Sequence, residues 1–205
     1  MKTDSQPMKA RRGRPLSFDR DAALEQAMLT FWRHGYETSS IADLTTAMGI
    51  TAPSLYTAFG DKRRLFLEAV ELYRGGPEAA PDMIASASDA HDAARALLEG
   101  AVERFTGRKT PKGCLMATAT SSCSAASADV QASLAAIRID TEARLRARID
   151  QDVNSGVLPS GSDPSILAAS TMCTIQGLST LARDGASRTK LNAIADATLA
   201  AWPQA

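Results

Sequence analysis

The sequence of 205 residues has few β-branched aliphatic side chains: 5 valines and 9 isoleucines stand against 38 alanines and 19 leucines. Alanine and leucine favour helices, whereas valine and isoleucine favour strands. The composition therefore predicts an all-α protein. The length indicates one domain, or two small domains that share a core.

Histidine and cysteine are also scarce, which argues against several kinds of site. His34 and His91 lack the spacing of metal ligands, so neither zinc binding nor histidine-based catalysis is expected. The three cysteines, at positions 114, 123 and 173, form no CxxC pair, and no secretory leader is recognisable. Both features predict a reduced, cytoplasmic protein without a metal or a cofactor.

The longest run without charge, residues 164–182, is too polar for a membrane span, because nine of its 19 residues are Ser, Thr, Gln, Gly or Pro. A surface helix normally carries a charged face, and this one would have none. It should therefore be covered on both sides. A second copy of the helix in a two-fold homodimer is the simplest cover, and a fully buried central helix in a monomer is the alternative.

Net charge of one sign is absent too, since 23 basic residues balance 23 acidic ones. This excludes a uniformly basic nucleic-acid coat. Residues 1–17 nevertheless carry five cations against one acid and show no hydrophobic period, so a flexible basic arm is predicted. Its Arg12-Gly13-Arg14-Pro15 segment resembles an AT-hook core, and Arg12 and Arg14 are expected to contact the minor groove or phosphates. A solvated tail is the alternative.

The pattern that carries chemistry lies between residues 39 and 62. Ser39 or Ser40 caps a short helix that ends at Gly49, and Thr51 caps a second helix over 52–59. Two short helices joined by such a turn predict a helix-turn-helix. The second helix would then enter the major groove and present small side chains to base edges, namely Thr51, Ala52, Pro53, Ser54 and Thr57.

The next helix, capped by Asp61, begins with Lys62, Arg63 and Arg64. Cations are unfavourable in a first turn, because the helix dipole prefers anions there. A bound DNA phosphate would relieve this conflict. The alternative is that the three side chains simply extend into water.

These segments together resemble the DNA-binding domain of the TetR family over residues 19–73. The motifs are Phe31-Trp32-Arg33-His34-Gly35-Tyr36-Glu37-Thr38-Ser39, Ile41-Ala42-Asp43-Leu44, Met48-Gly49-Ile50-Thr51, Ser54-Leu55-Tyr56 and Phe59-Gly60-Asp61-Lys62. The resemblance implies a homodimeric, all-helical, ligand-responsive transcriptional regulator, usually a repressor, that pairs through its last two helices. It also implies phosphate contacts by Ser39, Tyr56 and Lys62, and base contacts by the five small residues named above.

The predicted organisation has three parts. Residues 1–17 form the arm, residues 18–62 the DNA-binding domain, and residues 63–205 an effector-binding and dimerisation domain. A helix from 62 to about 74 connects the last two, and Gly75-Gly76-Pro77, with Pro81 beyond, marks a linker. Further helices are predicted over about 91–105, from near 113 into 121–127, over about 128–155, from 164, and from 188.

The resemblance places a small-molecule pocket among the middle helices. Its candidate lining residues are Phe105, Cys114, Met116, Thr118, Met172 and Gln176. Ordinary core packing is the alternative for each. Cys114 and Cys123 are nine residues apart and would face opposite ways on a continuous helix, so no disulfide is expected between them. Cys114 would be either a sensor of oxidants or electrophiles or a small buried hydrophobe.

The predicted function is a regulator, most often a repressor, that a small-molecule inducer releases from a palindromic double-stranded operator. A small helical enzyme is a poor alternative, because no nucleophile–base pair or phosphate loop is present. A helical adaptor that binds an acidic protein or a membrane through its basic patch is the third possibility.

Overall fold

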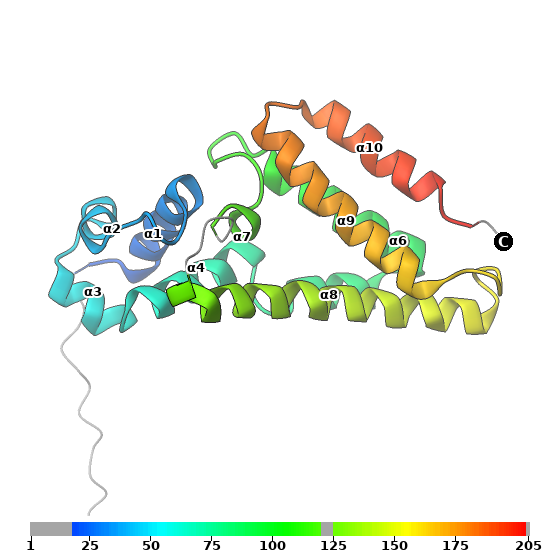
Figure 1. The fold of residues 1–205 in the computed structure, drawn as a ribbon, viewed down its shortest axis with the longest axis horizontal. Coiled ribbons are helices and arrows are strands. Elements are labelled where there is room, and N and C mark those ends of the chain that lie inside the picture. Colours follow the sequence, from blue (N-terminus) through cyan, green and yellow to red (C-terminus); the bar gives the residue numbers. More distant parts are fainter. Residues whose placement is uncertain (1–17, 120–124, 204–205) are drawn as a thin grey trace, which may run out of the picture.

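The computed structural model describes residues 18–119 and 125–203, and these residues form helices without strands (Figure 1). The predicted all-α fold class is confirmed. The elements are α1 (Arg20–His34), α2 (Ile41–Met48), α3 (Ala52–Phe59), α4 (Lys62–Arg74), α5 (Ala79–Ser86), α6 (Ala90–Phe105), α7 (Leu115–Thr118), a 3-10 turn (Ala125–Ser127), α8 (Ala128–Ser155), α9 (Pro164–Arg183) and α10 (Arg188–Ala200).

Side-chain caps set the starts of the first four helices. Asp19, Ser40, Thr51 and Asp61 each accept hydrogen bonds from backbone N–H groups in the first turn that would otherwise lack partners. Of the two serines considered for α2, Ser40 is the cap, and it forms a reciprocal capping box with Asp43.

The turn between α2 and α3 depends on Gly49. Its φ of 66° lies in the left-handed region, where a side chain would be strained. The turn positions α3 across α2, with Leu44 and Leu55 fully buried beneath them.

Aromatic side chains hold α1 against α4. The rings of Phe31 and Phe66 meet edge to face, with their centroids 5.0 Å apart, and Trp32 meets Tyr73 in the same way at 4.8 Å. Tyr73 lies in the last turn of α4, so this second pair brings the end of α4 beneath the DNA-binding domain.

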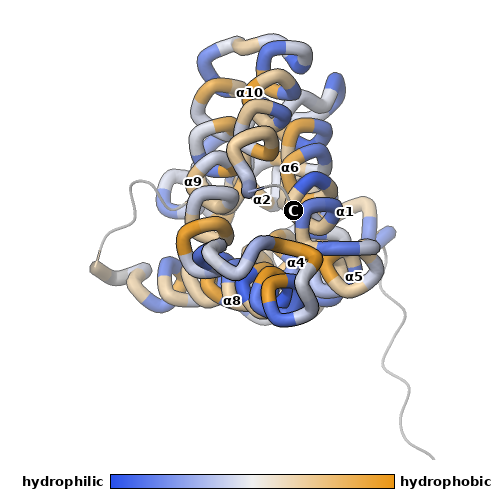
Figure 2. Tube along the Cα trace, turned by 90° about the vertical axis from the view of Figure 1, so that its right-hand side faces the viewer, coloured by the Kyte–Doolittle hydropathy of each residue, from blue (hydrophilic) through white to orange (hydrophobic). Residues whose placement is uncertain are grey.

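The C-terminal part is a bundle built on α8, the longest helix. Helices α6 and α9 pack on α8 and on each other, and α10 packs on α6 and α9 on the side away from α8 (Figures 1 and 2). Hydrophobic and hydrophilic positions alternate around these helices in Figure 2, as expected of helices with one buried side.

Two expectations about this part were wrong in detail. Helix α5 was not predicted: it follows Gly75-Gly76-Pro77 almost directly, and Pro81 falls in its first turn, where a missing N–H is tolerated. The helix expected to start near Gly113 begins two residues later, at Leu115, because Gly113 has a φ of 81° and Cys114 is extended. The two cysteines therefore do not share a helix beginning at 113, and Cys123 lies outside the described residues.

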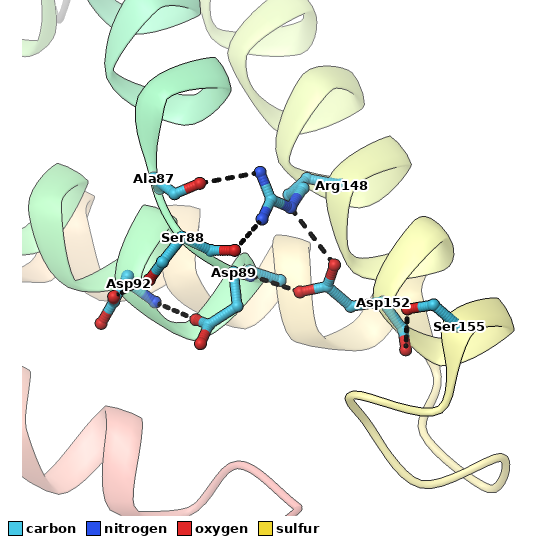
Figure 3. Close-up of polar contacts among 8 residues, drawn as sticks. Ala87, Ser88, Asp89, Asp92, Arg148, Asp152 and Ser155 are labelled. Carbon is cyan, nitrogen blue, oxygen red and sulfur yellow. Dashed lines mark hydrogen bonds and ion pairs between the residues drawn. The ribbon is translucent and has the colours of Figure 1, made fainter.

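A buried ion pair fastens the far end of α8 to the start of α6 (Figure 3). The carboxylate of Asp152, which is 4% exposed, accepts hydrogen bonds from the Ala90 N–H at 2.5 Å and from Arg148 Nε at 3.3 Å. The other guanidinium nitrogens of Arg148 donate to the carbonyls of Ala87 and Ser88, at 3.0 and 2.6 Å. The network connects α8 to the segment that joins α5 to α6.

Candidate nucleic-acid interface and internal cavity

Helix α3 presents one face to solvent and anchors the other in the core. Leu55 and Phe59 are buried, whereas Thr51, Pro53, Tyr56 and Thr57 are exposed. Ala52 and Ser54 are half-buried. The five small side chains and Tyr56 thus share a short helix that protrudes at one end of the molecule (Figure 1).

Internal hydrogen bonds orient the hydroxyl groups on this helix. Thr57 Oγ1 donates to the Pro53 carbonyl at 2.8 Å, and the hydroxyls of Thr51 and Ser54 lie 3.0 Å apart. A hydroxyl that donates inside the helix keeps its lone pairs available to accept from a base. Tyr56 is the large exposed group on this face, with 50% of its surface accessible.

Ser39, a predicted phosphate contact, lies in the loop between α1 and α2 and not on the exposed face of α3. Its side chain is 1% exposed, and its hydroxyl donates to the Gly35 carbonyl at 2.7 Å. The side chain therefore braces the loop between α1 and α2 instead of facing outward.

Lys62 lies at the N-terminus of α4, and contacts within the protein fix its side chain. Its ammonium donates to the Glu37 carbonyl at 3.3 Å and lies 4.7 Å from the centroid of the Tyr36 ring. Burial, reinforced by the carboxylates of Asp129 and Asp61, raises the pKa of Tyr36, so the ring stays neutral beneath the cation.

The adjacent Arg63 forms an ion pair with Asp129 in the first turn of α8. This contact partly relieves the accumulation of positive charge noted in the sequence, and it does so across the boundary between the two parts of the protein. The side chains are about half exposed, 45% and 53%. Arg12 and Arg14, the other candidate DNA contacts, lie outside the described residues.

A cavity of about 100 Å³ lies within the C-terminal part, between α4, α5, α6, α8 and α9. Five of the six predicted pocket residues line it, namely Phe105, Cys114, Met116, Met172 and Gln176. Thr118 does not. The residues that sequence reasoning missed come from α4, α5, α6 and α8, and include Tyr73, Met83, Leu97, Arg104, Arg138 and Thr141. Only the tertiary packing brings these helices to one cavity.

Tyr73 and Arg104 form a wall between this cavity and the DNA-binding part. Both also line a groove that contains Trp32 of α1. The Arg104 guanidinium lies 5.4 Å from the centroid of the Tyr73 ring, and that ring contacts Trp32. A molecule in the cavity would thus be one side chain away from α1.

Helix α9 leaves an uncharged face uncovered. Along this face Ile166, Ala169, Ser170, Cys173 and Gly177 are exposed. In the described part of the chain α9 is the helix long and apolar enough to cross a membrane, and 28% of that stretch is buried. The fully buried central helix that the sequence allowed is therefore not observed.

The described residues contain no group of three or more His, Cys, Asp or Glu side chains that could hold a metal ion. What they do contain is a helix-turn-helix with an exposed second helix, joined to a helical body that encloses a cavity. This combination is typical of DNA-binding regulators in which one polypeptide joins a helix-turn-helix to a second, helical domain.

Comparison with known proteins gives the same class. The family model described as "Bacterial regulatory proteins, tetR family" matches residues 23–69, and the "Tetracyclin repressor-like, C-terminal domain" matches residues 90–198. The HTH-type transcriptional repressor ComR of Escherichia coli is 38% identical over 100% of this chain and 99% of its own length. The chain belongs to the TetR family of transcriptional regulators.

Solved structures extend the similarity to the whole fold. A cysteine mutant of the TetR family regulator CifR, in complex with 26-base-pair operator DNA, matches 93% of this chain and 100% of its own, with 38% identity and a TM-score of 0.85. A putative TetR regulator from Rhodococcus is 37% identical over 91% of this chain, with a TM-score of 0.64. Members of the family act as homodimers on double-stranded DNA and respond to small molecules.

Proposed function

We propose that the protein is a repressor that binds a palindromic operator as a homodimer and dissociates from it when a small-molecule inducer enters the cavity. The observation that carries the proposal is the exposed face of α3, with Thr51, Pro53, Tyr56 and Thr57. The similarity to the HTH-type transcriptional repressor ComR supports it. The protein would act in the cytoplasm, as a regulator and not as an enzyme.

In this proposal the exposed face of α9 pairs with its counterpart in a second protomer, together with α10. Two-fold pairing would cover the uncharged surface and would present two recognition helices to one DNA duplex. A palindrome is bound when these helices are about one helical turn, or 34–36 Å, apart, or a multiple of this.

The inducer would act through the wall formed by Tyr73 and Arg104. A ligand that binds one arrangement of α4 and α6 more tightly than another shifts the protein toward it. Because Tyr73 contacts Trp32, a shift at the end of α4 would displace α1 and hence change the orientation of α3.

The roles assigned to α3 can be separated by two substitutions. Tyr56→Ala is expected to weaken binding about tenfold on every sequence, because a phosphate contact carries no sequence information. Thr57→Ala is expected to change the preference for one base pair in each half-site by about fivefold, the lower end of what a base contact provides. Both are measured by fluorescence anisotropy on the operator, located by footprinting DNA upstream of the protein's own gene, and on single-base variants of it.

Val157→Ala is the matched control, because Val157 is 48% exposed and lies at the far end of the C-terminal part. It should bind every duplex as the wild type does. Equal losses for Tyr56→Ala and Thr57→Ala on all sequences would contradict the division between phosphate and base contacts. A failure of the wild type to protect any upstream sequence would contradict the proposed function itself.

A second prediction concerns the ion pair between Arg63 and Asp129. Asp129→Asn should free Arg63 for a DNA phosphate, so that log K falls more steeply with log salt, by about 0.9 for each protomer. Asp150→Asn removes the same charge near the other end of α8 and should leave this slope unchanged. Identical slopes for the two variants would show that Arg63 makes no additional phosphate contact.

A further inference from the structure

The cavity combines an apolar interior with positive charge. Most of its lining is aliphatic, aromatic or sulfur-containing, as at Phe105 and Met172. Its charged lining residues are all arginines, Arg74, Arg104 and Arg138, and no Asp or Glu is among the lining residues. An apolar cavity with a few polar groups is the usual form of a small-molecule site, and here those groups favour a negative charge.

One of the three arginines is already neutralised. Arg74 Nη1 forms an ion pair with Glu71 at 2.9 Å, and Nη2 donates to the Pro77 carbonyl. This leaves Arg104 and Arg138 as the arginines available to a ligand.

Neither of these two has a carboxylate within 4.0 Å among the described residues. Glu142, one turn after Arg138 on α8, and Glu103, beside Arg104, each line an outer groove together with that arginine, but neither forms an ion pair with it. A partly buried guanidinium without a carboxylate partner binds an anion favourably, because ion pairs of this kind are strongest where water is excluded.

A third donor lies at the same cavity. Tyr73 is 7% exposed, and its hydroxyl makes no hydrogen bond of ordinary geometry in the described part of the chain. Burial, with a further contribution from the Cys114 thiol, raises its pKa, so the hydroxyl keeps its proton and can donate. The hydroxyl lies close to the Leu115 N–H, which is a donor, and to the Cys114 thiol, which is a weak acceptor. Buried hydroxyls are nearly always paired, so a ligand oxygen at the cavity wall would supply the strong acceptor that the Tyr73 proton lacks.

The volume limits the size of the ligand. About 100 Å³ is below the 300–1,000 Å³ of typical drug-sized pockets and is closer to a cavity of about 150 Å³ that accepts benzene. A compact apolar body, such as one aromatic ring or a short acyl chain, fits this size with a small widening.

We propose that the effector is a small organic carboxylate. The guanidinium groups of Arg104 and Arg138 and the hydroxyl of Tyr73 bind its carboxylate, and its compact apolar body packs against Phe105 and Met172. The inference rests on the proposed function, since it names the chemical class of the inducer that the cavity takes.

The test is isothermal titration of the full-length protein with benzoate, phenylacetate and hexanoate, each paired with its neutral amide. At least one carboxylate is expected to bind once per protomer, at least tenfold more tightly than its amide. Absence of binding by all three carboxylates, or equal binding of each acid and its amide, would overturn the proposal.

Variants locate the donors. Arg104→Gln and Arg138→Gln should each weaken carboxylate binding about tenfold and reduce the preference over the amide, and Arg138→Lys should restore part of both. Tyr73→Phe removes one oxygen atom and should weaken binding three- to tenfold. Arg146→Gln, at an exposed position of α8 away from the cavity, is the matched control and should bind as the wild type. Wild-type binding and preference in both Gln variants would refute these assignments.

Operator release separates this proposal from the proposed function. If a neutral compound released the protein from the operator and no carboxylate did, the proposed function as a repressor would stand and an anionic inducer would be excluded. Tight carboxylate binding without any operator binding would support the assignment of the cavity and contradict repression.

Discussion

Gly177→Glu is expected to convert the protein to a monomer and to weaken operator binding more than 100-fold. Gly177 lies on the uncharged, exposed face of α9, together with Ala169 and Cys173. In a two-fold pairing of α9, the new carboxylates would be removed from water without a partner, which costs several kcal/mol for each charge. Operator affinity would fall because two linked DNA-binding domains bind about 10²–10⁴-fold more tightly than a single one.

The protomer itself should tolerate this change. A Cβ atom at Gly177 meets nothing within 4 Å, and glycine in a helix is less stable than most residues by roughly 0.5–1 kcal/mol. The helical circular dichroism of the variant should therefore match that of the wild type. Light scattering measures the oligomeric state, and anisotropy measures the affinity for the operator.

The control is Ala147→Glu, which adds the same charge at an exposed position of α8. It should remain dimeric and bind the operator normally. A dimeric Gly177→Glu variant with wild-type affinity would mean that another surface joins the protomers.

Asp152→Ala is expected to lower the free energy of unfolding by about 3 kcal/mol. The substitution removes the acceptor of the buried Ala90 N–H and the charge partner of Arg148, whose side chain is 16% exposed. A buried pair need not add net stability, but removing one partner leaves the other charge uncompensated. Asp152→Asn keeps an acceptor for Ala90 and should lose less, about 1–2 kcal/mol.

The measurement is urea denaturation followed by circular dichroism, at one protein concentration, because dimerisation contributes to apparent stability. Asp150→Ala is the matched control: it removes the same side chain two residues earlier, from an exposed site, and should change the free energy of unfolding by less than about 0.5 kcal/mol. Equal effects at 150 and 152 would show that the network in Figure 3 contributes little.

Local signals in the sequence were sufficient for the N-terminal helices. Caps such as Asp19 and Thr51, and the left-handed position of Gly49, act within a few residues, so the sequence alone predicts where these helices begin and end. The exposure of Tyr56 and Thr57 follows from the same pattern, because the buried face of α3 is marked by Leu55 and Phe59.

The sequence was misleading where local signals conflict or where contacts are distant. Pro81 indicates a linker, yet packing on α6 and α8 stabilises α5 around it. Asp152 has the form of a solvated surface residue, and it is buried because the start of α6, 62 positions earlier, lies against it. Ser39 has the local pattern of a cap or a phosphate contact, whereas the fold turns its side chain inward.

The sequence by itself therefore determined the all-α class, the helix-turn-helix and the uncharged character of α9, because each depends on residue type and short-range spacing. Tertiary structure alone decided what surrounds the cavity, since α4, α5, α6, α8 and α9 contribute residues that are up to about 100 positions apart. It also decided which cations stay without a carboxylate. Arg63 pairs with Asp129 because the packing brings the first turns of α4 and α8 together, whereas Arg74 pairs with Glu71 on its own helix. Helix packing places Arg104 and Arg138 at the cavity without a carboxylate partner.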